Sequence, residues 1–131
     1  MLIANRVQPG KRPRSSMSPF MVFDENDNLS MVIGSPGGSR IINYVAKTML
    51  GVLEWDMDIQ SAISLPHFVN RNGGTDLEKN TEAAMLKGEL EALGHQVSVR
   101  DLNSGLHGIT INSEGLQGGA DPRRVGRAMG Q

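Results

Sequence analysis

A glycine-rich stretch, GSPGGSR at residues 34–40, lies between the apolar run MVI and the longer run IINYVAKTML. A strand, a glycine turn and a helix start gather unpaired backbone N–H groups at one point, where anions bind. The stretch lacks the lysine and spacing of a GxxxxGK[ST] phosphate loop, and it contains no GxGxxG. Gly37 and Gly38 could instead donate two consecutive N–H groups to an oxyanion. The alternative is a tight strand-to-helix turn with no ligand, and the loop by itself favours that interpretation.

A second polar cluster is RSSMSP at residues 14–19. The hydroxyls of Ser15 and Ser16 could hydrogen-bond a carboxylate or an ammonium group. The alternative is a polar linker in which these serines bind nothing. No GxSxG elbow surrounds them, and no histidine or aspartate is adjacent in the sequence, so we do not expect a serine nucleophile here.

The remaining reactive residue types do not form a known motif. His67, His95 and His107 are far apart and show no HxxxH or HExxH spacing, so we expect surface or turn residues and no metal site. Cysteine is absent, and nothing indicates a cofactor. The basic runs at 11–14 and 121–124 are expected to be solvated or paired with carboxylates. With so few aromatic residues and a net charge of -1, we expect no nucleic-acid partner.

The elements that must position these groups follow from the periodicity of apolar residues. Residues 1–16 contain little of it and are predicted to form an extended, exposed arm. Helical spacing and capping residues predict helices over residues 38–55, 58–64 and 80–95. Alternating or apolar runs between turn residues predict short strands over residues 17–23, 29–34, 75–79, 96–102 and 108–112. A further short strand is expected in the last segment, and residues 66–74 are expected to be irregular.

These elements imply an α/β fold of the α+β type, with antiparallel hairpins and layered packing. The first two strands are expected to be mostly buried. The length of 131 residues suits one domain. No apolar run reaches about 18 residues, so no membrane segment is predicted, and the N-terminus lacks the zones of a signal peptide.

Four segments together resemble the gamma-glutamyltranspeptidases. They are NRVQPGKRPRSSMSP, VIGSPGGSRIINYV, the AISLPHF run with NRN two residues later, and DLNSGLHGI followed by GGADPRR. The likeness covers residues 5–124 and matches the C-terminal part of the family's small, catalytic subunit. It implies an N-terminal-nucleophile hydrolase with an αββα sandwich, of which residues 1–131 would be a single, partial domain.

The resemblance also implies roles for the two polar clusters. Ser15 and Ser16 match the paired serines that contact the glutamyl α-carboxylate in the family. Gly37 and Gly38 match the paired glycines whose N–H groups form the oxyanion hole. Family members cleave the gamma-glutamyl amide of glutathione and related compounds, and they transfer the glutamyl group to water, amino acids or peptides.

The chain also departs from the family pattern. The family's nucleophile is a threonine, exposed by self-cleavage at the small-subunit N-terminus, and none of Thr48, Thr75, Thr81 and Thr110 occupies such a position. We therefore expect the chain by itself to be inactive, and its partners to be the large subunit and the remainder of the small subunit. The alternative is a non-enzymatic module that binds glutamate or assists subunit assembly.

Two further expectations follow. The resemblance implies a periplasmic or extracellular location, although the chain carries no targeting signal of its own. In the family fold, other strands complete the sheets, so part of an apolar face should be uncovered here. We expect the chain to self-associate through that face, as a homodimer.

Overall fold

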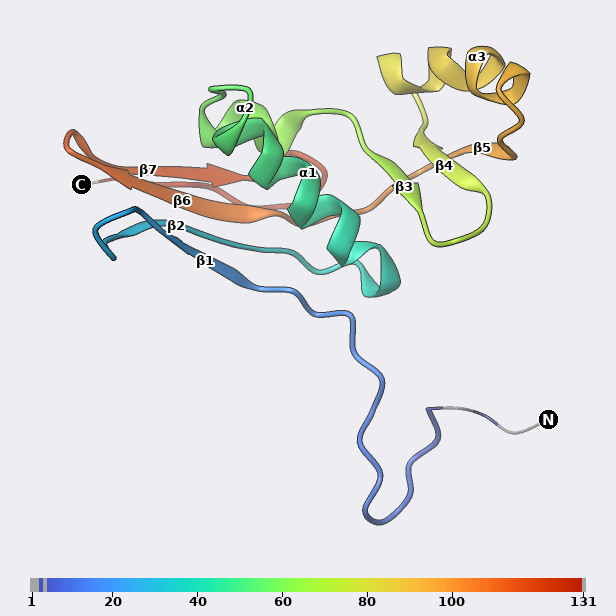
Figure 1. Cartoon of the computed structure of the whole chain (residues 1–131), viewed down its shortest axis with the longest axis horizontal. Helices are drawn as coiled ribbons and strands as arrows, with labels where there is room; N and C mark the ends of the chain where they lie inside the picture. The colour runs from blue at the N-terminus through green and yellow to red at the C-terminus, as the bar shows by residue number, and fades with distance from the viewer. Residues whose placement is uncertain (1–2, 4, 131) are drawn as a thin grey trace.

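The computed structural model describes residue 3 and residues 5–130. Its largest element is an antiparallel sheet with the strand order β1-β2-β6-β7 (Figure 1). These strands are β1 (Phe20–Phe23), β2 (Leu29–Gly34), β6 (His107–Asn112) and β7 (Gly115–Ala120). The first hairpin closes as predicted: the Asp24 carboxylate accepts the backbone N–H groups of Asn26 and Asn28 at 2.9 and 2.8 Å.

One face of this sheet is covered by α1 (Ile41–Leu53) and α2 (Ile59–Ser64), as Figure 1 shows. The predicted helices at these positions are confirmed. Asp58 caps α2, since its carboxylate accepts the N–H of Ser61 at 3.0 Å. The buried core consists of Met31, Ile33, Ile41, Tyr44, Val45, Ile59, Ile63, Val69, Leu102 and Leu106.

A second, smaller sheet has the order β3-β4-β5 and lies at the other end of the molecule (Figure 1). Its strands are β3 (Phe68–Asn70), β4 (Thr75–Glu78) and β5 (Val97–Arg100). β4 and β5 run parallel, and the 3₁₀ helix η2 (Glu82–Leu86) followed by α3 (Lys87–Ala92) forms the crossover between them.

Three sequence-based expectations need correction. The stretch 66–74 is not wholly irregular, because β3 pairs with β4 there and the two form a hairpin. The strand β1 is not mostly buried: it is an edge strand, and Phe20, Met21 and Phe23 are each about half exposed or more. The helix predicted over residues 80–95 is divided into η2 and α3, and α3 ends at Ala92, two residues before Gly94, whose φ is 91°.

The predicted arm is confirmed over the residues that the structure describes; residues 1, 2 and 4 lie outside them. It is extended, it leads away from the sheets, and it reaches the body of the molecule at β1 (Figure 1). Within the described ranges, no helix combines the length and apolar character needed to cross a bilayer.

Candidate active site

The loop between β2 and α1 requires glycine at both positions of the pair. Gly37 has φ 144° and Gly38 has φ 59°, conformations that side-chain-bearing residues rarely adopt. A Cβ at Gly37 would lie 2.7 Å from Cε2 of Tyr44, whereas a Cβ at Gly38 would meet nothing within 4 Å. The loop is therefore packed tightly against the core at Gly37 and open beside Gly38.

The 3₁₀ helix η1 (Gly38–Arg40) begins at this pair and continues into α1. Among the described residues, no side chain makes a capping hydrogen bond to η1 or α1. The Ser39 hydroxyl accepts a hydrogen bond from Nη1 of Arg71 at 2.7 Å. The backbone N–H groups at the start of the helix are thus left without a side-chain partner from the described residues, as an anion site would require.

The paired serines lie on the arm just before β1. The Ser15 hydroxyl accepts the N–H of Met17 at 3.2 Å, and the Ser16 carbonyl accepts the hydroxyl of Ser18 at 3.1 Å. Ser16 lines a groove of about 700 Å³ together with Ser39, the neighbour of Gly38. The structure therefore brings Ser16 close to the start of η1, while Ser15 and the two glycines are not among the groove's lining residues in the described chain.

The charge of this groove is mainly positive. Arg14, Arg71 and Arg100 line it, and Asp76 is its one acidic lining residue in the part of the chain that the structure describes. Asp76 is already paired: its carboxylate contacts Arg40 at 3.0 Å and Arg100 at 3.2 Å. Guanidinium groups bind carboxylates through paired hydrogen bonds, so the groove suits a carboxylate-bearing ligand.

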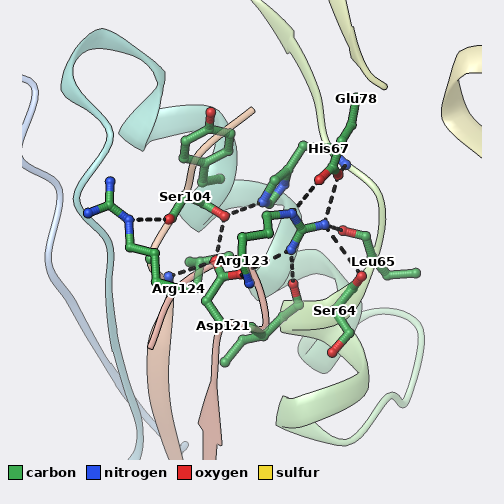
Figure 2. Close-up of polar contacts among 12 residues, drawn as sticks. Ser64, Leu65, His67, Glu78, Ser104, Asp121, Arg123 and Arg124 are labelled. Atoms are coloured by element: carbon green, nitrogen blue, oxygen red, sulfur yellow. Dashed lines mark hydrogen bonds and ion pairs between the residues drawn. The ribbon is translucent and has the colours of Figure 1, made fainter. Parts of the chain in front are cut away.

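A buried polar network joins β4 to the segments that follow α2, β5 and β7 (Figure 2). His67 is 0 % exposed, and its Nε2 lies 2.6 Å from the Ser104 hydroxyl. The Ser104 hydroxyl donates to Oδ2 of Asp121, and the same oxygen accepts the N–H of Leu106 at 2.9 Å. These contacts connect the segment after α2, the segment after β5 and the turn after β7.

The tautomer of His67 follows from these contacts. Ser104 has a single hydroxyl proton and gives it to Asp121, so its oxygen accepts the proton on Nε2 of His67. Nδ1 then carries the lone pair and has no hydrogen-bond partner among the described atoms. Burial, together with the positive charges of Lys47 and Arg123, lowers the pKa of His67 to about 3, so the ring is neutral at physiological pH.

Asp121 is the anion that organises this network. Burial alone would raise the pKa of its carboxyl, but hydrogen bonds from Ser104 and from the backbone N–H groups of Arg123 and Leu106 lower it overall. Oδ1 of Asp121 accepts the Arg123 N–H at 2.9 Å, and it also contacts Nη1 of that guanidinium at 3.2 Å. The turn at residues 121–124 is thereby held in one conformation.

Arg123 carries the other half of the network. Nε and Nη2 of its guanidinium contact the Glu78 carboxylate at 2.5 and 2.8 Å, and its remaining donors reach backbone carbonyls at the end of α2 (Figure 2). Lys47 is also buried nearby, and its Nζ donates to the carbonyl of Leu65 at 2.5 Å. Burial, followed by the charge of Arg123, lowers the pKa of Lys47 to about 8.

The expectation that all three histidines are surface or turn residues is wrong for His67, which is fully buried. The expected carboxylate pairing of the run 121–124 is confirmed at Arg123, but this side chain is only 13 % exposed and is not a surface residue. Sequence reasoning assigned no role to Ser104 or Asp121. Both belong to segments that carried the family resemblance, and that signal could have identified them. No metal-binding cluster occurs among the described residues.

Comparisons with known proteins agree on one family. The family described as gamma-glutamyltranspeptidase matches residues 2–131. The glutathione hydrolase proenzyme of Bacillus subtilis (strain 168) is 34% identical over 131 residues, which is 97% of this chain and 22% of that protein. The glutathione hydrolase proenzyme of Escherichia coli is 36% identical over 125 residues, which is 93% of this chain and 21% of that protein. The chain thus spans about a fifth of the length of these relatives.

Solved structures show the same fold. A mutant gamma-glutamyltranspeptidase of Helicobacter pylori superposes with a TM-score of 0.81 at 34% identity, over 92% of this chain and 68% of that one. The gamma-glutamyltranspeptidase of Pseudomonas nitroreducens gives a TM-score of 0.82 at 27% identity, over 98% of this chain and 69% of that one. About a third of each of those chains therefore has no counterpart in this one.

Proposed function

Because this chain belongs to the gamma-glutamyltranspeptidase family, we propose that it is part of an enzyme that cleaves gamma-glutamyl amide bonds. Its donors would be glutathione and related compounds, and the acceptors water, amino acids or peptides. The observation that carries this proposal is the match over residues 2–131, together with 34% and 36% identity to two glutathione hydrolase proenzymes.

The glycine pair would supply the oxyanion hole. Attack on the gamma-glutamyl carbonyl makes its oxygen negative, and two backbone N–H groups of the loop would stabilise that charge in the transition state. Three features support this role. Both glycines have positive φ, helix η1 begins at Gly38, and the space beside Gly38 is open. A side chain at Gly38 would occupy the space that a substrate carbonyl needs.

Ser15 and Ser16 would contact the α-carboxylate of the glutamyl group. Supporting this role, Ser16 lines the basic groove that begins next to the glycine loop. Hydroxyl donors beside guanidinium groups recognise a carboxylate through charge-assisted hydrogen bonds. The proposal thus places substrate carboxylate and reacting carbonyl on neighbouring parts of one surface.

The chain would depend on other segments for its nucleophile. Thr48 is buried and donates to the carbonyl of Tyr44, Thr75 and Thr110 lie within strands, and Thr81 donates to the carbonyl of Glu78. None is exposed by chain cleavage in the way that the family mechanism requires. The partners would be the large subunit and the remainder of the small subunit, at a periplasmic or extracellular location.

Two measurements test the proposal. The isolated chain should not hydrolyse gamma-glutamyl-p-nitroanilide. Turnover by a homogeneous sample would contradict the prediction that this chain depends on another segment for its nucleophile. A chimera in which this chain replaces the matching segment of the Escherichia coli relative should hydrolyse the same substrate. Gly38→Val in the chimera should reduce kcat by about 10²-fold or more while glutamate still binds, since it removes transition-state stabilisation.

The chimera also decides between the enzyme and a binding module. Its self-cleavage into two subunits reports whether the chain has assembled correctly, independently of turnover. A chimera that assembles and binds glutamate but does not turn over would overturn the enzymatic role. That result would favour the alternative of a non-enzymatic glutamate-binding or assembly module.

A further inference from the structure

The glycine loop is held mainly by packing, because its own hydrogen bonds are few. Within the loop, the N–H of Arg40 donates to the Gly37 carbonyl at 3.3 Å and the Ser35 hydroxyl donates to the Pro36 carbonyl at 2.7 Å. The side chain of Ser39 is held by Arg71, which is exposed. The orientation of the glycine pair must therefore depend on what the loop rests against.

The C-terminal side of the loop rests on Tyr44. The ring is 1 % exposed, and its edge lies where a Cβ of Gly37 would be. The same ring packs against His67, with ring centroids 4.3 Å apart and an interplanar angle of 39°. Since protein interiors are close-packed, a displacement of His67 would move Tyr44 and with it Gly37.

The N-terminal side of the loop rests on Gly105. A Cβ at Gly105 would lie 2.6 Å from Cγ of Pro36 and 2.9 Å from Cδ of Arg124, so only glycine fits between these two side chains. The N–H of Gly105 also donates to the Ser35 hydroxyl at 3.3 Å. Both flanks of the glycine pair are thus in contact with groups that adjoin Ser104.

Ser104 is fixed from three directions. Its hydroxyl joins His67 to Asp121, and its carbonyl accepts a hydrogen bond from Nε of Arg124 at 2.7 Å (Figure 2). It is 0 % exposed, so no substrate can reach it directly. These hydrogen bonds of Ser104 are thus all made with other residues of the chain.

We propose that Ser104 is a positioning residue for the oxyanion loop. It fixes Gly37 and Gly38 through His67 and Tyr44 on one side and through Gly105 and Pro36 on the other. The consequence for catalysis rests on the proposed function, but the positioning itself does not. Loss of the Ser104 hydroxyl removes the acceptor of the His67 Nε2 proton. It also removes one hydrogen-bond donor from Oδ2 of Asp121 and leaves a small cavity beside that oxygen.

The test uses the full chain labelled with ¹⁵N. Ser104→Ala should shift or broaden the amide signals of Gly37 and Gly38 while far-ultraviolet circular dichroism shows a folded chain. Ser30→Ala is the matched control, because it also removes a serine hydroxyl, one that donates to the Val22 carbonyl in the first hairpin. Glycine signals that move no more in Ser104→Ala than in Ser30→Ala would overturn the proposal.

A second pair of variants decides the matter if Ser104→Ala does not fold. No hydrogen bond of the Tyr44 hydroxyl is present among the described residues, so Tyr44→Phe keeps the supporting ring and Tyr44→Leu removes it. We expect the glycine signals to stay in place in Tyr44→Phe and to move in Tyr44→Leu. Unchanged signals in a folded Tyr44→Leu chain would contradict the proposal.

The chimera separates this inference from the proposed function. There, Ser104→Ala should lower kcat by about tenfold with KM nearly unchanged, since a displaced oxyanion donor acts on the transition state. A variant whose glycine signals move while kcat stays the same would refute the oxyanion role of the loop and leave the positioning intact. A variant in which neither changes would refute the positioning.

Discussion

At the scale of single residues, the two glycines of the loop differ in what they require. Gly37 is confined by both its backbone and the Tyr44 ring, whereas Gly38 is confined by its backbone alone. A substitution at Gly37 should therefore affect mainly the stability of the chain, and a substitution at Gly38 mainly the activity. Gly37 serves mainly the packing of the loop, and Gly38 keeps the space beside it open.

We predict that Gly37→Ala destabilises the chain more than Gly38→Ala. At Gly38, a side chain at φ near 60° costs about 1–2 kcal/mol. Gly37 has φ 144°, which side-chain-bearing residues also rarely adopt, and Gly37→Ala adds a clash with the Tyr44 ring. Urea unfolding, monitored by circular dichroism, measures the free energy of unfolding of both variants. Gly88→Ala is the control: this glycine lies in α3 with open space around it, so alanine should stabilise by about 0.5–1 kcal/mol. Equal losses at Gly37 and Gly38 would show that Tyr44 does not constrain the loop.

Lys47 offers a pH-dependent test of the buried network. Its pKa falls from 10.5 to about 8 on folding, mainly because burial disfavours the charged amine. Between these two values the unfolded chain binds the proton and the folded chain does not, so Lys47 makes the chain more stable as pH rises. Below about pH 8 both states are charged, and the cost of the buried charge is fully present.

We therefore predict that Lys47→Met stabilises the chain at pH 7 and that its advantage shrinks as pH rises toward 10.5. The difference in the folding equilibrium should change by about tenfold per pH unit in that window. The Leu65 carbonyl keeps its hydrogen bond from Arg123 at 2.9 Å, so the substitution strands no acceptor. Lys87→Met is the control, because Lys87 is half exposed and pairs with Glu91 on the surface. If the difference in stability between Lys47→Met and the unsubstituted chain did not change with pH, the buried charge at Lys47 would be contradicted.

At the scale of elements, Arg123 is the main link between the turn after β7, the end of α2 and β4. Its guanidinium donates to the carbonyls of Ile63 and Leu65, and so supplies hydrogen-bond donors to carbonyl groups at the C-terminal end of α2. It also neutralises Glu78 and Asp121, which are both buried. Removing it would leave two buried carboxylates without their cation.

We predict that Arg123→Gln lowers the free energy of unfolding by about 3–5 kcal/mol, the usual cost of breaking a buried ion pair. Arg123→Lys should recover only a small part, since an ammonium group cannot reach the carboxylates and the helix carbonyls together. Urea unfolding again measures both variants. Arg6→Gln on the exposed arm is the control and should have no measurable effect. Full recovery by lysine would show that charge alone matters.

At the scale of the whole molecule, helices cover one face of the four-stranded sheet, and the other face is covered only in part, by the C-terminal segment (Figure 1). Neighbouring strands place Met21, Val32 and Ile109 in register on the other face, and Leu116 follows on β7. Met21 and Leu116 are 68% and 75% exposed. This face borders a groove of about 1470 Å³, of which the C-terminal residues 127–130 form one wall.

We predict that the isolated chain self-associates through this open face, because apolar surface left in water favours association. Met21→Lys with Leu116→Lys should shift the sedimentation coefficient toward the monomer value. Leu93→Lys is the matched control, since this exposed leucine follows α3 at the far end of the molecule (Figure 1). A chain that sediments as a monomer at high concentration would contradict the prediction. An equal response in the control would show that association does not use this face.

The sequence by itself determined the family and those elements whose signals are local. Turn chemistry defined the first hairpin, apolar spacing located α1, and Asp58 marked the start of α2, because these signals depend on neighbours in the chain. It also singled out Gly37 and Gly38, since a strand, paired glycines and a helix start form one local pattern. The family motifs identified the relatives that the comparisons then showed.

Only the tertiary structure decided which residues support that loop. His67, Ser104 and Asp121 are 37 and 17 residues apart along the chain, yet they form one hydrogen-bonded series. Burial keeps His67 neutral, and hydrogen bonds from Ser104, Leu106 and Arg123 keep Asp121 charged. No local pattern in the sequence specifies contacts that arise when separate elements pack together. The same holds for β3 and the edge strand β1, because a strand's pairing and exposure depend on distant partners.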